Sequence, residues 1–159
     1  MPESQTIVLN PRPIAAETIP YTIPVMLSKI AAGFPSPADD YVEGRIDLNE
    51  HLILHREATF LLRVSGWSMR DAGIFDGDEI LVDRAIEPTD GRIVVAALHG
   101  ELTVKRLRRQ NGMVSLMAEN PDFSPIILQQ GEECLIWGVV TRALHPASCI
   151  RCKRADRPR

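Results

Sequence analysis

The chain has 159 residues, a formal net charge of −3, 45% hydrophobic residues and 25% charged residues. These values are typical of a folded globular protein with its own core, and the mild negative charge gives no general attraction to nucleic acid. The longest clean apolar run, IVVAAL at 93–98, is far shorter than the roughly 20 residues that span a bilayer. We therefore expect no membrane-spanning segment.

Residues 1–32 are predicted to form a flexible N-terminal arm. Prolines interrupt any long regular element there, at Pro2, Pro11, Pro13, Pro20 and Pro24. One or two turns of helix fit at VMLSKIAA, residues 25–32. The first residues, MPESQ, carry proline and acid where a signal peptide has basic residues and an apolar run, so we expect a cytoplasmic protein.

Residues 33–47 begin with GFPSPADDY, in which two prolines favour an extended, turn-rich chain. A helix is predicted over 48–56, because Asp47 is a good N-cap and Glu50 completes a capping-box pattern. The apolar face of this helix is predicted to be Leu48, Leu52 and Ile53.

From residue 58 onward, short runs rich in valine, isoleucine and leucine predict β-strands. They are TFLLRV (59–64), EILVD (79–83), RIVVAAL (92–98), ELTVKRLR (101–108), MVSLMA (113–118) and LIWGVVTRAL (135–144). His99-Gly100 is a two-residue loop between two of these runs and predicts a β-hairpin. We expect a mainly β, mostly antiparallel domain over 33–145, folded on itself or barrel-like, and a basic, disordered tail over 146–159.

Three cysteines fit a reducing compartment. Cys134 lies beside an apolar strand and is predicted to be a buried small hydrophobic residue. Cys149 and Cys152 form a C-x-x-C motif, with His145 four residues before the first cysteine. A zinc site needs four ligands and the chain has no second pair, so we expect no metal and interpret the tail pair as exposed and oxidisable.

Ser68, in the loop SGWSM, is the candidate nucleophile, and a serine hydroxyl needs a base within hydrogen-bond reach. Histidine is the usual base, but we interpret all four histidines as solvated surface residues: His51, His55, His99 and His145. Among the lysines, Lys29 and Lys153 lie in the end segments, whereas Lys105 lies inside a predicted strand.

Strand alternation places Lys105 on the same face as Thr103 and Leu107. Burial against apolar neighbours lowers the pKa of a lysine, and a neutral amine beside a serine hydroxyl acts as a general base. The pattern alone leaves a second interpretation open, in which Lys105 is an edge-strand lysine that blocks aggregation.

Three motifs occur in order: SGWSM-x5-F-D-G-D-x-I-L-V-D, then GRIVVA, then ELTVKRL. Over roughly residues 22–145 the chain resembles the self-cleaving serine peptidases of the LexA/UmuD family. The resemblance implies that Ser68 is the nucleophile and Lys105 the general base of a Ser-Lys dyad, with no metal or cofactor. It also implies cleavage at Ala32-Gly33, and an oxyanion hole formed by backbone N–H groups at Trp67 and Ser68. Without the resemblance, Ala32-Gly33 reads as a helix end with a glycine stop.

The arm is too short and too rich in proline for the helix-turn-helix domain of LexA-type repressors. The segment GFPSPADDYVEGRIDLN is similar to the UmuD branch of the family. This implies a role in the SOS response, in which the cleaved homodimer is the accessory subunit of an error-prone translesion DNA polymerase of the Y family, with a UmuC-like catalytic subunit. It also implies activation of cleavage by the RecA–single-stranded DNA filament, contacts with other replication proteins, and no sequence-specific DNA binding.

Three other functions stay open at this point. The chain could be a non-catalytic interaction subunit of the polymerase that keeps the peptidase fold. A signal-peptidase relative is disfavoured because we expect no membrane anchor, and a repressor is disfavoured because we expect no DNA-binding domain. The presence of Ser68, Lys105 and Ala32-Gly33 together favours the self-cleaving peptidase.

Overall fold

The computed structural model describes residues 7–14, 22–26, 42–129 and 132–147 of the chain. Its strands are β1 (Ile7–Pro13), β2 (Thr22–Met26), β3 (Val42–Asp47), β4 (Thr59–Ser65), β5 (Glu79–Asp83), β6 (Ile93–Leu98), β7 (Glu101–Gln110), β8 (Met113–Met117), β9 (Ile126–Ile127) and β10 (Cys134–Leu144). Helical structure in these ranges is limited to α1 (Leu48–Leu52) and two 3-10 turns, Arg56–Ala58 and Arg70–Ala72. The prediction of a mainly β fold is confirmed.

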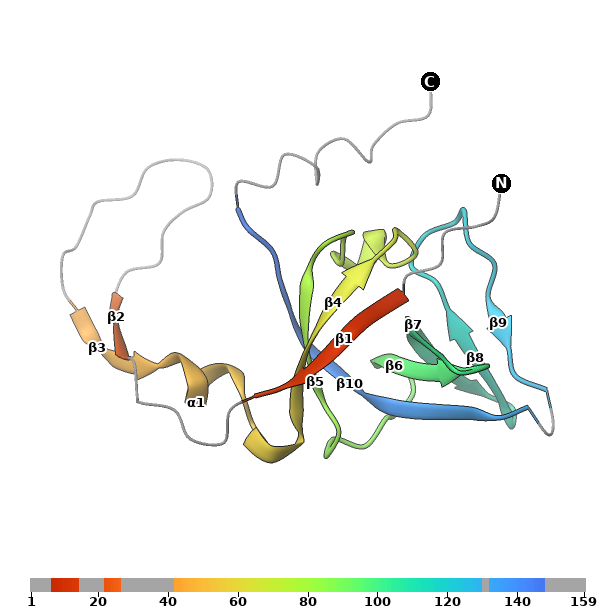
Figure 1. Ribbon diagram of the computed structural model, residues 1–159, viewed down its shortest axis with the longest axis horizontal. Coiled ribbons are helices and arrows are strands. Elements are labelled where there is room, and N and C mark those ends of the chain that lie inside the picture. Colours follow the sequence, from red (N-terminus) through yellow and green to blue (C-terminus); the bar gives the residue numbers. More distant parts are fainter. Residues whose placement is uncertain (1–6, 15–21, 27–41, 130–131, 148–159) are drawn as a thin grey trace, which may run out of the picture.

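Eight strands form one antiparallel sheet in the order β1-β4-β5-β10-β6-β7-β8-β9. An additional pairing between β1 and β7 joins the first six strands of this order into a ring. The sheet therefore closes into a small barrel, with β8 and β9 extending it beyond β7 (Figure 1). The predicted barrel-like architecture is confirmed, and it places β4 and β7 on either side of β1.

Strand β1 lies in the arm, where the prolines led us to expect no long regular element. It runs antiparallel to β4 with Ile7 opposite Ser65, and Ile7 also pairs with Thr103 of β7. The register shifts between Leu9 and Arg12, at the position of Pro11. A bulge at the sheet margin accommodates a residue that has no N–H to donate, which explains why the prolines interrupt the strand without preventing it.

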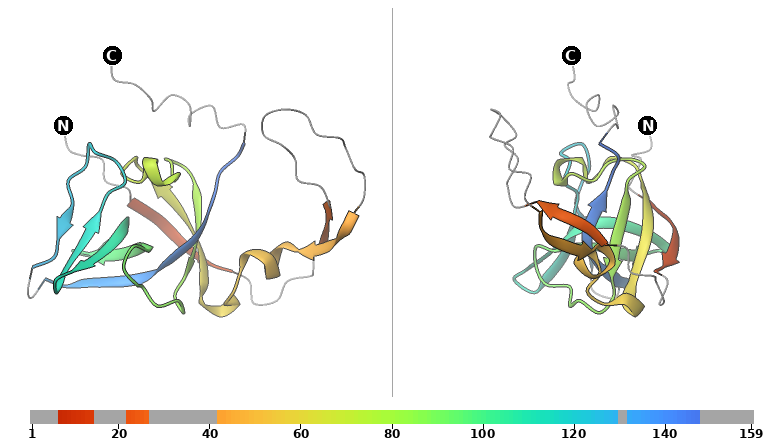
Figure 2. Two further views of the ribbon diagram at one scale, coloured as in Figure 1. Left: turned by 180° about the vertical axis from the view of Figure 1, so that it is seen from behind. Right: turned by 90° about the vertical axis from the view of Figure 1, so that its left-hand side faces the viewer.

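A separate two-stranded ribbon of β2 and β3, together with α1, lies to one side of the barrel (Figure 2). The helical turns predicted over 25–32 are wrong at their start, because residues 25 and 26 belong to β2 and pair with β3. The rest of that segment lies outside the described residues.

Helix α1 begins where the sequence predicts, since the Asp47 side chain accepts a hydrogen bond from the Asn49 N–H at 2.9 Å. The predicted length is wrong, because Ile53 is already extended and a 3-10 turn follows at Arg56–Ala58. No residue of α1 is buried, and Leu48 is exposed. The helix lacks a packed apolar face, so tertiary contacts do not stabilise additional turns.

The strands predicted from residue 58 onward are all present, with ends that differ by at most two residues. The His99-Gly100 hairpin is confirmed, because both residues have positive φ, 50° and 82°. Positive φ at both central residues matches the right-handed twist of the flanking strands. Strand β9, which has two residues, was not predicted.

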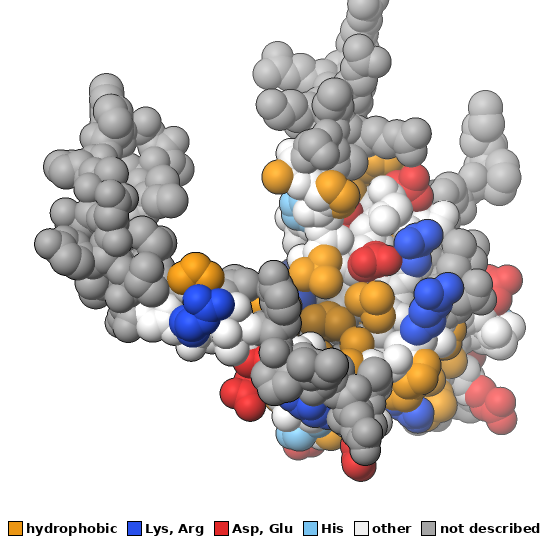
Figure 3. Space-filling model, turned by 60° about the vertical axis from the view of Figure 1, so that its left-hand side comes forward, with side chains coloured by type: hydrophobic (Ala, Val, Ile, Leu, Met, Phe, Trp, Pro, Cys, Tyr) orange, Lys and Arg blue, Asp and Glu red, His pale blue; other side chains and the backbone are white. Residues whose placement is uncertain are grey.

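The core lies inside the ring and continues between β6, β7, β8 and β10. Its largest cluster contains Leu62, Val64, Met69, Ile74, Ile80, Val82, Val95 and Val104, and the second contains Val94, Ala96, Leu107, Leu116 and Val139. On one face of the molecule, hydrophobic side chains also gather at the surface with lysine or arginine side chains beside them (Figure 3). Within the described ranges, none of the helices has the length and apolar character needed to cross a bilayer.

Candidate active site

The loop after β4 holds Ser68 through a dense set of hydrogen bonds. The Gly66 N–H donates to Asp76 Oδ1 at 2.8 Å, and Gly66 has a φ of 101° that favours glycine. At the two ends of the same loop, the Val64 N–H donates to the carbonyl oxygen of Asp78 at 2.8 Å, and the Gly77 N–H donates to the carbonyl oxygen of Val64 at 2.9 Å. Two ends of one loop are thus joined, which fixes the path of the SGWSM segment.

Strand β7 brings Lys105 to this loop. Lys105 lies opposite Val94 of β6, and its Nζ donates a hydrogen bond to Ser68 Oγ at 2.7 Å. Lys105 is 1% exposed and Ser68 is fully buried. β7 lies between β6 and β8 in the sheet, so the interpretation of Lys105 as an edge-strand lysine is wrong.

The surroundings of Lys105 disfavour its charged form. Burial lowers the pKa of Lys105 from 10.5 to about 8, because the ammonium loses its hydration in the barrel interior. Its neighbours on the same face, Thr103 and Leu107, are buried as the strand alternation predicts. A lysine with this pKa has a neutral fraction of roughly a tenth at pH 7, so the free amine is available for proton transfer.

A second loop, after β8, braces the backbone at Ser68. The Glu119 N–H donates to the carbonyl oxygen of Ser68 at 2.8 Å, and Asn120 Nδ2 donates to the carbonyl oxygen of Trp67 at 2.9 Å. Asn120 is 5% exposed, and Glu119 is held in turn by an ion pair with Arg106. No sequence signal predicted these two contacts, since Ala-Glu-Asn-Pro has the composition of an ordinary turn.

Trp67 packs on the loop that follows it. Its ring meets the ring of Phe75 edge-on at 6.5 Å between centroids, and Phe75 meets His145 at 5.9 Å. The carbonyl oxygen of Trp67 accepts hydrogen bonds from Asn120 Nδ2 and from the Arg70 N–H, the latter at 3.2 Å. These two bonds orient the peptide unit between Trp67 and Ser68. The backbone N–H groups of Trp67 and Ser68 therefore belong to a segment whose geometry is fixed, although their role as an oxyanion hole stays a prediction.

The other residues considered for the site are the four histidines, which the structure describes, and a set of residues that lie outside the described ranges. All four histidines are exposed, as predicted, and three of them pair with acidic side chains: His55 with Asp83, His99 with Glu132 and His145 with Asp78. The predicted cleavage site, Ala32-Gly33, lies outside the described residues, as do Lys29, Cys149, Cys152 and Lys153.

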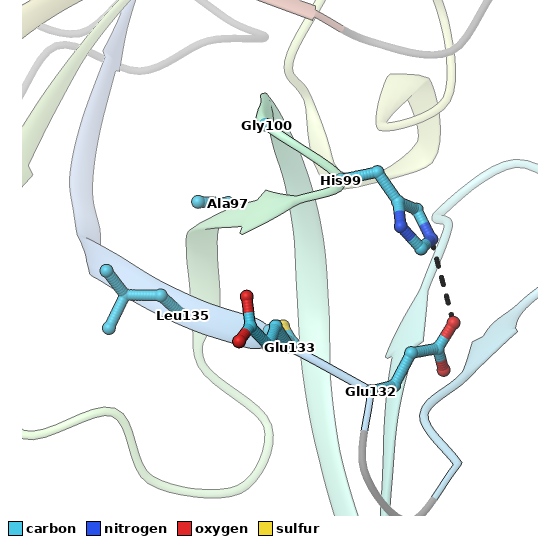
Figure 4. Close-up of a pocket in the computed structure, with 7 residues that line it drawn as sticks. Ala97, His99, Gly100, Glu132, Glu133 and Leu135 are labelled. Carbon is cyan, nitrogen blue, oxygen red and sulfur yellow. Dashed lines mark ion pairs between the residues drawn. The ribbon is translucent and has the colours of Figure 1, made fainter.

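A surface pocket of about 650 Å³ lies at the other end of the β6–β7 hairpin (Figure 4). Its lining consists of Ala97, His99, Gly100, Glu132, Glu133, Cys134 and Leu135, so it is separate from Ser68 and Lys105. Cys134 is half-buried rather than buried, and burial raises the pKa of its thiol, helped by the nearby charge of Glu132. Among the described residues, no group of three or more histidine, cysteine, aspartate or glutamate side chains is arranged to hold a metal ion.

The amino-acid sequence of the chain is similar to those of known proteins. Residues 24–141 match the Peptidase S24-like family, and the chain belongs to this family. It is 46% identical to Protein MucA of Salmonella typhimurium over 82% of the chain and 90% of MucA. It is 44% identical to Protein ImpA of Salmonella typhimurium over 82% of the chain and 89% of ImpA. The LexA repressor of Bordetella pertussis is 43% identical over 76% of the chain, which spans 57% of the repressor.

Proposed function

We propose that the chain is a self-cleaving serine peptidase that cuts its own Ala32-Gly33 bond with a Ser68–Lys105 dyad. The observation that carries this proposal is the 2.7 Å contact between Lys105 Nζ and Ser68 Oγ, made by two buried side chains. A buried pair of this kind supplies both an uncharged base and a hydroxyl within its reach. Membership in the S24-like peptidase family supports the same chemistry.

We infer the steps of the reaction from the chemistry of these groups. Neutral Lys105 accepts the hydroxyl proton as Ser68 Oγ attacks the carbonyl carbon of Ala32, and backbone N–H groups at Trp67 and Ser68 stabilise the oxyanion. The protonated Lys105 then donates to the amine of Gly33 as the Ala32–Gly33 bond breaks. Water hydrolyses the ester between Ala32 and Ser68, with Lys105 as base again, and restores the serine. No cofactor enters any step.

Docking of the arm brings the Ala32-Gly33 bond to the dyad. The rate of cleavage then depends on how much of the protein has the arm docked. We propose that the RecA–single-stranded DNA filament accelerates cleavage by stabilising this docked state. Equal cleavage rates with and without the filament, under matched conditions, would contradict this part of the proposal.

The biological role rests on the relatives. Similarity to MucA and ImpA over most of both chains supports placing the protein in the SOS response. We propose that the cleaved protein, residues 33–159, is a cytoplasmic homodimer and the accessory subunit of a UmuC-like, Y-family translesion DNA polymerase. Contacts with other replication proteins belong to the same proposal. A size measurement that shows only monomer at micromolar concentration would contradict the homodimer.

The decisive experiment is incubation of the purified chain at pH about 10, followed by intact mass measurement. High pH converts Lys105 to the neutral amine without any partner, so the chemistry is tested apart from its activation. We expect two fragments that separate between Ala32 and Gly33. Ser68→Ala and Lys105→Ala should stay intact, whereas Ser115→Ala, a half-buried serine on β8, should be cut like the wild type.

A wild-type chain that stays intact at this pH, and also after addition of the activated RecA filament, would contradict the peptidase proposal. The alternative would then be a non-catalytic interaction subunit with the same fold. Cleavage of the wild type at another bond would retain the dyad and reject Ala32-Gly33 as its target.

A further inference from the structure

Strand β1 occupies a position in the barrel that another extended segment could take. It pairs antiparallel with β4 from Ile7 opposite Ser65 to Pro13 opposite Phe60, whereas within the described residues its backbone pairing with β7 is at Ile7 opposite Thr103. Figure 1 shows β1 lying across the barrel beside β4, with β7 near its end. Along most of its length, β1 is thus an edge strand held by the backbone of β4.

The sequence of β1 suits an edge strand. Pro11 and Pro13 have no N–H to offer, and with Arg12 they are exposed. Prolines and charged side chains on an outer strand prevent another chain from adding to the sheet. β1 therefore closes the barrel against strand addition as well as filling the position beside β4.

Strand β4, which β1 covers, has less of this protection. Its sequence, TFLLRVS, contains no proline and a single charged residue, Arg63. Leu62 and Val64 are anchored in the core at 1% exposure each. Without β1, this strand would present a rigid row of unpaired backbone N–H and C=O groups, which is the arrangement that binds an extended peptide by strand addition.

The position also lies next to the proposed dyad. Ser65, opposite Ile7, comes three residues before Ser68, and Thr103, also paired with Ile7, comes two residues before Lys105. Whatever strand lies beside β4 therefore ends at the catalytic loop.

We propose that the edge of β4, covered by β1 in the intact chain, is a binding site for an extended, largely apolar segment of a partner protein, and that self-cleavage makes it available. The inference rests on the proposed cut at Ala32-Gly33, because β1 belongs to the part that is separated from the barrel. Before cleavage, the peptide chain keeps β1 beside β4 at an effective concentration of about a millimolar. After cleavage, β1 is an ordinary competing ligand that a partner segment can replace.

The test uses a fluorescent synthetic peptide with the sequence of residues 6–14, TIVLNPRPI, as the probe. Its binding is measured by anisotropy to two proteins: the uncut Ser68→Ala chain, and the wild-type chain after self-cleavage, which denaturing mass measurement verifies. We expect binding to the cleaved protein that is at least about tenfold tighter than to the uncut chain. Hydrogen exchange of the β4 amides should be slowed when the peptide binds.

A peptide of the same composition in scrambled order is the control, and it should bind neither protein. Equal binding of the probe to cut and uncut protein, binding to neither, or equal binding of the scrambled peptide would each overturn the proposal. If the wild-type chain does not cut itself, the proposed cleavage fails but the binding site is still testable.

That test introduces Val8→Pro and Leu9→Pro together into the Ser68→Ala chain. In an antiparallel pair, adjacent residues point their N–H groups to opposite sides, so one of these two prolines removes a donor to β4. Because β1 then pairs less strongly with β4, the probe should bind the uncut chain. A probe that still fails to bind would reject the edge of β4 as a binding site.

Discussion

The side-chain amide of Asn120 donates a 2.9 Å hydrogen bond to the carbonyl oxygen of Trp67, a residue 53 positions away in the sequence. The same loop supplies the Glu119 N–H to the carbonyl oxygen of Ser68. Two consecutive carbonyl groups of the SGWSM loop are therefore held from outside the loop. This arrangement fixes the peptide unit that precedes the proposed nucleophile.

We predict that Asn120→Ala slows self-cleavage roughly ten- to a hundredfold, because a small displacement of a reacting group is costly in rate. The pH at which the rate levels off should stay unchanged, since Lys105 keeps its surroundings. Asp122→Ala is the matched control: its backbone N–H donates to Asn120 Oδ1, and the substitution preserves that N–H. A cleavage rate for Asn120→Ala equal to that of the control would show that the brace has no effect on the reaction.

The rate of self-cleavage should rise about tenfold per pH unit below pH 8 and level off above it. The cause is the lowered pKa of Lys105, about 8, since only the neutral amine accepts the serine proton. Intact mass measured over time from pH 6 to pH 10 gives the profile. Lys105→Arg should be inactive throughout, because a guanidinium stays protonated in this range. A flat profile would argue against Lys105 as the base.

Lys105 should destabilise the fold at neutral pH. Its pKa is about 8 in the folded protein and 10.5 when exposed, so below pH 8 burial of the charge acts against folding, and the penalty declines as pH rises toward 10.5. Lys105→Met should therefore be more stable than Ser68→Ala at pH 7, by on the order of 3 kcal/mol. Urea unfolding at pH 7 and pH 10 measures the difference, which should shrink at the higher pH. A difference independent of pH would contradict the shifted pKa.

Gly138, in β10, is predicted to tolerate no side chain. A Cβ at this position would lie 2.7 Å from Val82 Cγ1 and 3.2 Å from the carbonyl oxygen of Asp83. Gly138→Ala should lower the free energy of unfolding by about 1–3 kcal/mol, because the core must shift to admit the methyl group. Gly44→Ala, where nothing lies within 4 Å, should change it by less than about 0.5 kcal/mol. Both are measured by urea unfolding in the Ser68→Ala chain, and equal effects would contradict the packing argument.

The strands from β4 onward, apart from the two-residue β9, were predictable because local signals agree there. β5 matches its predicted range, and the β6–β7 hairpin follows from His99-Gly100, whose positive φ values only a few residue types adopt readily. The arm strands were not predictable, since the prolines of β1 disfavour a strand unless it lies at the margin of a sheet. That margin exists only because β4 and β7 come together in the folded barrel.

The residues of the candidate site also divide into those that the sequence predicts and those that it does not. Alternation along β7 predicts that Lys105 shares a buried face with Thr103 and Leu107, and the family resemblance pairs it with Ser68; the structure brings these two side chains together. Asn120 could not be predicted, because its partner is a backbone carbonyl on another loop. A backbone carbonyl leaves no mark in the sequence, so only the three-dimensional structure identifies such a contact.

The order of strands in the barrel also determines which strand completes the sheet that carries the proposed dyad. Ser68 follows β4 and Lys105 lies on β7, and β10 is the strand that joins β5 to β6 between them. Among the ten described strands, β10 is the last to leave the ribosome. Until it is inserted, the two halves of the sheet share only the contact through β1. A nascent chain therefore carries Ser68 and Lys105 before it has made β10, the strand that closes the sheet between β5 and β6.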